Sequence, residues 1–94
     1  MTMLEIYKSV LPEYARVENV KKRPGKYTFD LVLEPEGIRK QESIPVSWNP
    51  DKAEGFCQAI IRTTVAVMYL DAGYIDKSRE ALDTLPEPKV DDEF

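Results

Sequence analysis

Four basic residues lie within six positions of the chain and form a cluster that could bind anionic groups. They are Lys21, Lys22, Arg23 and Lys26, on either side of the dipeptide Pro24-Gly25. Such a cluster at a hairpin tip can contact phosphate groups. It can equally protect exposed strand ends from pairing with other strands. Because no aromatic residue interleaves the cluster as a stacking platform for bases, binding of nucleic acid or an acidic partner is our second hypothesis.

Side chains that commonly catalyse reactions are scarce in this chain. The 94 residues include no histidine, which is the most frequent general base and metal ligand. The single cysteine, Cys57, lies between apolar residues without a histidine to activate it, so we expect a buried core residue. The sequence contains no phosphate-binding loop, dinucleotide fingerprint or nucleophile elbow. We therefore expect no catalytic residue, no metal site and no cofactor.

The charge of the chain is −4 and is unevenly distributed. Residues 1–48 carry eight basic and seven acidic side chains, whereas residues 49–94 carry five basic and ten acidic ones. This excess of acid argues against strong non-specific binding to nucleic acid. One cysteine cannot form an internal disulfide, and no apolar run approaches the ~20 residues of a membrane span. We expect a cytoplasmic protein that does not contact membranes.

The first half of the chain has the pattern of a short helix followed by a hairpin sheet. Thr2 and Glu5 have the spacing of a capping box, and apolar residues recur at helical intervals up to Pro12. Strands are predicted at about 14–21, at 27–34 and at 38–48. In the second of them, apolar and polar residues alternate with the period of a half-buried strand.

A long helix is predicted over residues 49–72, with Asn49 as its N-cap and Gly73 as its C-cap. Its apolar residues fall on two stripes. The main stripe contains Ala53, Phe56, Cys57, Ile60, Thr64, Val67 and Met68, and the second contains Ile61, Val65 and Ala72, with Tyr69 at its border. A short helix follows at about 76–85.

These elements predict an α+β fold in which a three-stranded antiparallel sheet carries the long helix on one face. The element order is helix, three strands and two helices. We expect a single domain over residues 1–86 and an acidic C-terminal tail over residues 87–94.

The order of helix, three strands and helix over about residues 2–72 resembles the double-stranded-RNA-binding domain in topology. In that family the first hairpin loop and a lysine-rich start of the second helix contact RNA. The basic cluster matches the loop. The helix start departs from the family pattern, because Asp51 and Glu54 flank a single lysine, Lys52, and we do not carry the RNA-binding activity over.

The last five residues, Val90-Asp91-Asp92-Glu93-Phe94, resemble the acidic tips of bacterial single-stranded-DNA-binding proteins. In those tips a terminal phenylalanine enters a pocket of a partner protein. Glu93 replaces the usual proline. The alternative is a solvated acidic tail.

Three aromatic residues near the two ends of the long helix are Trp48, Tyr69 and Tyr74. Together they could form an aromatic wall for a ligand. We favour the alternative that they cover the edge of the core, with the rings buried and the polar atoms in water.

The long helix is too apolar for so short a chain to cover with the predicted elements alone. The last helix can cover part of the second stripe through Ile75, Leu82 and Leu85. We therefore expect a protein-interaction surface formed by Ile61, Val65, Tyr69 and Phe94. The first functional hypothesis is a non-catalytic interaction module, such as a small adaptor, inhibitor or assembly factor of bacterial or phage type. Its partner would be another protein chain, either a second copy or a hetero-partner.

Overall fold

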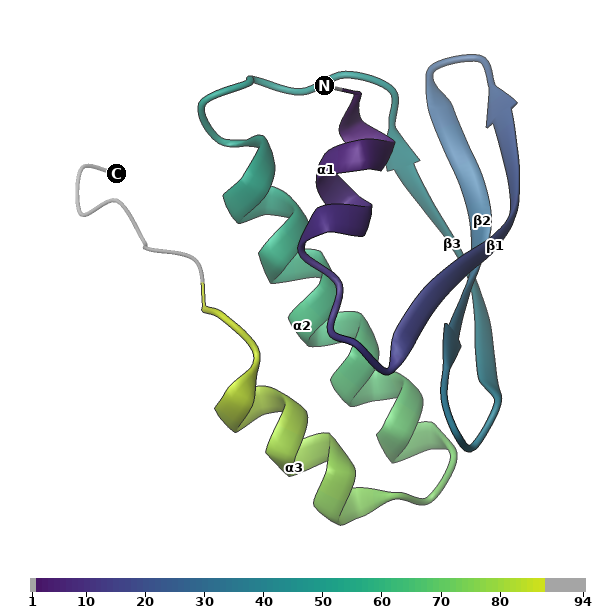
Figure 1. Cartoon of the computed structure of the whole chain (residues 1–94), viewed down its shortest axis with the longest axis vertical. Helices are drawn as coiled ribbons and strands as arrows, with labels where there is room; N and C mark the ends of the chain where they lie inside the picture. The colour runs from purple at the N-terminus through teal and green to yellow at the C-terminus, as the bar shows by residue number, and fades with distance from the viewer. Residues whose placement is uncertain (1, 88–94) are drawn as a thin grey trace.

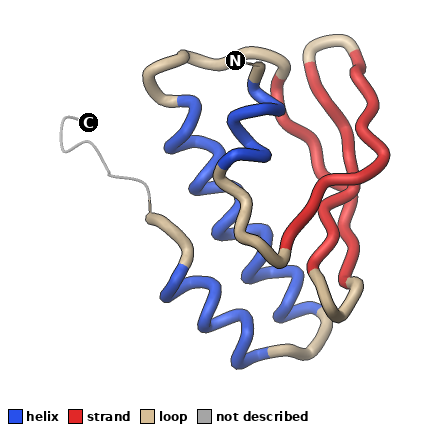
Figure 2. The backbone as a smooth tube through the Cα atoms, in the orientation of Figure 1, coloured by secondary structure: helices blue, strands red, loops and turns tan. Residues whose placement is uncertain are grey.

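The computed structural model describes residues 2–87 and shows three helices and one three-stranded sheet (Figure 1). In chain order the elements are α1 (Met3–Ser9), β1 (Ala15–Arg23), β2 (Lys26–Leu33), β3 (Ile38–Pro45), α2 (Ala53–Asp71) and α3 (Ile75–Thr84). The predicted α+β fold and its element order are confirmed. Figure 2 shows the sheet on one side of the molecule, α2 next to it, and α3 on the side of α2 away from the sheet.

The sheet is an antiparallel meander with the strand order β1-β2-β3. Arg23 pairs with Lys26 across the first turn, and Leu33 pairs with Ile38 across the second. The register of β1 shifts between Glu18 and Lys21, where Asn19 has a φ of 54°. Asparagine tolerates this left-handed conformation better than most residues, so it can form the bulge.

α1 begins with the predicted cap. The Thr2 hydroxyl accepts a hydrogen bond from the Glu5 backbone N–H at 3.2 Å and donates one to the Glu5 carboxylate at 3.1 Å. One of the backbone donors that the first helical turn leaves open is therefore satisfied. The helix ends at Ser9, shortly before Pro12.

The start of α2 differs from the prediction. The helix begins at Ala53, and Lys52 is its N-cap residue without a side-chain hydrogen bond. Asn49 instead stabilises a turn, because its side-chain oxygen accepts from the Asp51 N–H at 3.0 Å and its carbonyl accepts from the Lys52 N–H at 3.0 Å. Asparagine is common both in such turns and at helix N-caps, which explains why the predicted helix start was placed too early.

α2 ends at Asp71 with Ala72 as its C-cap residue, one position before the predicted C-cap, Gly73. The Tyr74 N–H donates to the Tyr69 carbonyl at 2.8 Å, and the Gly73 N–H donates to the Leu70 carbonyl at 3.0 Å. This pair of bonds is the Schellman motif, which requires a left-handed residue, and Gly73 has a φ of 89°. The chain can then turn back, so that α3 packs on α2.

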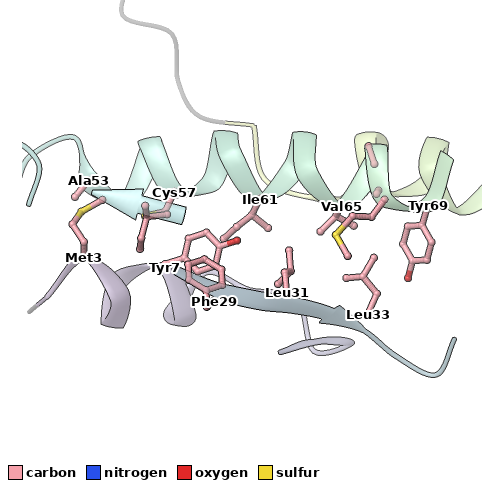
Figure 3. Packing of buried hydrophobic residues seen from close by; sticks show 14 residues of the cluster. Met3, Tyr7, Phe29, Leu31, Leu33, Ala53, Cys57, Ile61, Val65 and Tyr69 are labelled. Atoms are coloured by element: carbon pink, nitrogen blue, oxygen red, sulfur yellow. The ribbon is translucent and has the colours of Figure 1, made fainter. Parts of the chain in front are cut away.

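The core lies between β2, α1 and one face of α2 (Figure 3). Phe29, Leu31 and Leu33 point from β2 toward the helices and are at most 1% exposed. The rings of Tyr7 and Phe29 are 5.0 Å apart. On α2 the core residues are Ala53, Cys57, Ile61, Val65, Ala66, Met68 and Tyr69. The alternation predicted for the second strand therefore correctly identified the face that points toward the helices, although Val32 on the other face is also buried, at 1% exposed.

Candidate interaction surfaces

The three α2 residues that we expected to face a partner are buried in their own chain. Ile61 is 2% exposed, Val65 is 0% exposed and Tyr69 is 4% exposed. Figure 3 shows all three on the side of α2 that points toward β2. The proposed interface can therefore not consist of these side chains. Phe94, the fourth predicted contact residue, lies outside the described residues.

The opposite face of α2 exposes apolar side chains instead. Val67 is 36% exposed and Leu70 is 54% exposed, while Phe56 and Ile60 are half-buried. These four residues recur at helical intervals on one side of α2, with exposed Thr63 between Ile60 and Val67, and form a row that we call the outer face. Three of them belong to the stripe that the sequence pattern placed against the core.

Trp48 extends the outer face at the N-terminal end of α2. Strand β3 ends at Pro45, so the predicted strand over residues 38–48 was too long, and Trp48 lies outside the strand and is 47% exposed. Its ring stacks on Phe56, with 4.4 Å between the centroids and 20° between the planes. The two stacked rings form a broad apolar surface that is held in one place, because each limits the rotation of the other.

α3 covers α2 with small residues rather than with the large ones that we expected. Ser78 and Ala81 are buried, and the Ser78 hydroxyl donates to the Ala66 carbonyl at 2.7 Å. By contrast Ile75 is 54% exposed and Leu82 is 41% exposed. Ile75 and Leu82 therefore add to the exposed surface, whereas Leu85, the C-cap residue of α3, is half-buried against the core.

An arginine fixes the position of α3 at its far end. The Arg62 guanidinium donates to the Leu82 carbonyl at 3.1 Å from Nε and at 2.7 Å from Nη2. This carbonyl is in the last turn of α3, where helical carbonyls have no partner within the helix. Arg62 therefore completes the helix end and belongs to the polar edge beside the outer face.

The predicted basic cluster lies at the tip of the β1–β2 hairpin. Lys21, Lys22, Arg23 and Lys26 are all exposed. In the part of the chain that the structure describes, none of them forms an ion pair. The structure thus presents four unneutralised positive charges on one projecting hairpin.

The open face of the sheet carries a network of paired charges. Arg39 donates to Glu18 and to Asp30 at 3.1 Å each, and Arg16 pairs with Glu18 and Glu34. Hydrogen bonds from Asn19 and Arg39 hold the pKa of Asp30 below its ordinary value. Because two guanidinium groups offset three carboxylates, the network has a small net charge, and this face offers little net attraction to a charged partner.

Reactive chemistry is sparse among residues 2–87. Cys57 is completely buried, and burial raises the pKa of its thiol. A thiol of this kind is a poor nucleophile, because the thiolate is the reactive form. No group of three or more acidic or cysteine side chains in the described region could hold a metal ion. None of the described helices has both the length and the hydropathy that a bilayer crossing requires.

No protein-family model matches this chain, and no curated protein or solved structure was found to be significantly similar to it.

Proposed function

We propose that the protein is a non-catalytic interaction module that binds a partner protein through the outer face of α2. The observation that carries the proposal is the row formed by Phe56, Ile60, Val67 and Leu70, extended by Trp48. Buried apolar surface contributes about 25 cal/mol per Å², so covering this row would stabilise a complex. Aromatic side chains are also enriched among the residues that dominate binding energies.

The charge around the outer face favours a hetero-partner over a second copy. Residues 49–87, which include α2 and α3, carry seven acidic and four basic side chains. Two copies of this surface would repel each other, whereas a partner with an apolar patch and a basic rim would be attracted. We therefore assign the outer face to a protein partner of that chemistry.

The test compares two valines of similar exposure. Val67→Asp places a charge on the outer face, and Val20→Asp places the same charge on β1, where Val20 is 39% exposed. Both variants should remain folded by circular dichroism. Used as baits against lysate, wild type and Val20→Asp should enrich the same protein at least ~10-fold over Val67→Asp.

The enriched protein must then bind in purified form. Calorimetry should give a dissociation constant that is at least ~10-fold higher for Val67→Asp than for the wild type. For the wild type the dissociation constant should rise with salt, as binding to a basic partner requires. Identical bait profiles for all three proteins would overturn the proposal. So would a stable dimer in light scattering that Val67→Asp dissociates, because the outer face would then belong to a second copy.

The exposed basic hairpin supports a second candidate, nucleic-acid binding. Fluorescence anisotropy with labelled single- and double-stranded DNA and RNA at low salt tests it. Binding should weaken with salt and with the double change Lys22→Gln and Arg23→Gln. No binding below ~10 μM at low salt would exclude this candidate, because phosphate attraction alone should be visible there.

A further inference from the structure

A cavity of about 330 Å³ lies where α3 meets the start of β1 and the turn between β2 and β3. Its polar and aromatic lining consists of Tyr14, Glu34, Tyr69, Lys77, Glu80 and Thr84. No outer-face residue contributes to it. The volume is at the lower end of the range for ligand pockets, which suits one side chain of a partner rather than a large cofactor.

Two tyrosine rings form the aromatic part of this pocket. The centroids of Tyr14 and Tyr69 are 6.1 Å apart, and the ring planes are inclined by 48°. Tyr69 is only 4% exposed, so its ring is held in place by the core. The faces of such rings are negative and attract cations within about 6 Å.

One of these two rings, Tyr69, already has a positive charge near it, which it shares with the neighbouring ring of Tyr74 outside the pocket. Lys77 Nζ is 5.8 Å from the centroid of Tyr69 and 5.6 Å from that of Tyr74. Lys77 also forms an ion pair with Glu36, whose side chain is 9% exposed. The second carboxylate oxygen of Glu36 is buried and has no hydrogen-bond donor among the described residues. The Lys77–Glu36 pair carries no net charge, so the positive charge of Lys77 beside the pocket is neutralised by Glu36.

Glu80 supplies an acidic group in the pocket itself. Burial and the nearby Glu80 carboxylate raise the pKa of Tyr14, and burial, Tyr14 and Glu80 raise the pKa of Tyr69. The negative potential of Glu80 thus extends to both rings. Within residues 2–87 no lysine or arginine pairs with Glu80, whereas Glu34 is held by Arg16.

We propose that this pocket binds the guanidinium group of an arginine side chain presented by a peptide or protein. A guanidinium is planar, stacks on tyrosine and donates several hydrogen bonds, so it can contact the rings and Glu80 at once. It is also more weakly hydrated than an ammonium group and loses less on entering a partly apolar cavity.

The test uses n-butylguanidinium as the probe and n-butylurea as its neutral isostere, with isotope-labelled protein observed by NMR. The guanidinium should cause saturable shift changes at Tyr14, Tyr69 and Glu80, and the urea should not. Glu80→Gln should weaken binding by at least ~5-fold. Asp83→Asn is the matched control, because Asp83 is exposed on the same helix and does not line the pocket.

A second variant separates the aromatic contribution from the charge. Tyr14→Leu should also weaken binding of n-butylguanidinium, whereas Val67→Asp should leave it unchanged, so this result is independent of the outer face. Equal shifts with n-butylurea, equal affinity for n-butylammonium, or equal effects of Glu80→Gln and Asp83→Asn would each overturn the proposal. The absence of saturable shifts at the three pocket residues would overturn it as well.

Discussion

The inner and outer faces of α2 both carry large apolar side chains, but they differ in what covers them. The inner face contacts β2 and α1, and its residues are buried almost completely. The outer face is left open beside α3, which packs through serine and alanine. The same residue types therefore have two roles. On the inner face they stabilise the fold, and on the outer face they provide surface for an intermolecular contact.

The largest expected effect is on the free energy of unfolding and comes from comparing Val65 with Val67. The two residues are roughly 200° apart around the helix. Val65→Asp buries an unpaired charge and should destabilise the domain by more than about 4 kcal/mol, enough to unfold most of it. Val67→Asp should change stability by less than about 1 kcal/mol. Urea unfolding followed by circular dichroism measures both. Similar stabilities for the two variants would contradict the assignment of the faces.

A second prediction concerns the buried Tyr7 on α1, whose hydroxyl has no hydrogen-bond partner among the described residues. An unsatisfied buried hydroxyl is unfavourable by about 1–3 kcal/mol, so Tyr7→Phe should stabilise the protein by about 1–2 kcal/mol. The half-buried Tyr27→Phe provides the control and should have a smaller effect. A destabilised Tyr7→Phe variant would show that the hydroxyl does have a partner.

Tyr7 also predicts how stability depends on pH. Burial, followed by the charges of Glu42 and Cys57, raises the pKa of Tyr7 far above its ordinary value of 10.0. Above pH 10 the unfolded chain loses this proton while the folded chain retains it, so unfolding becomes more favourable as pH rises. Stability of the wild type should therefore fall between pH 9.5 and about 11.5, and Tyr7→Phe should reduce the fall. Parallel pH profiles for the two proteins would refute this cause.

The third prediction tests the way in which α3 is attached. Ser78→Ala removes a buried hydrogen bond and should destabilise the protein by about 1 kcal/mol. Ile75→Ala removes a much larger side chain that is exposed, and should change stability by less than about 0.5 kcal/mol. Thermal unfolding of both variants gives the comparison. A larger effect at Ile75 would mean that α3 packs on α2 through its large residues after all.

The smallest effect is expected from Leu70→Gln on the outer face. Because Leu70 is 54% exposed, the stability should stay within about 0.5 kcal/mol of the wild type. The change should nevertheless reduce the fluorescence of the dye ANS, which rises when the dye binds exposed apolar surface. Unchanged dye fluorescence would indicate that Leu70 is not part of a continuous apolar surface.

Much of this architecture could be predicted from local patterns. The capping residues Thr2 and Glu5 identified the first helix, the alternation around Phe29 identified the buried face of β2, and Gly73 identified the end of α2. Each of these signals depends on residues that are close together in the sequence. The start of α2 was misplaced because Asn49 suits both a helix cap and a turn.

The choice between the two faces of α2 could not be made in this way. Both stripes are apolar, so periodicity alone does not say which one the sheet covers, and the directions from which α1 and β2 approach decide it. The pocket at Tyr14 and Tyr69 could not be predicted from the sequence either, since its residues come from separate segments that only the tertiary fold brings together. Exposure of the basic hairpin was predictable, because charges beside a turn rarely become buried.

Cys57 gives the molecule a built-in reporter of its own opening. The thiol is enclosed by the core and protonated, so an aqueous alkylating or disulfide reagent has no access to it while α2 stays in place. Modification must then wait for a transient separation of the helices, and its rate at saturating reagent equals the opening rate. A single cysteine thus allows the kinetic lifetime of the native state to be timed without any engineered label.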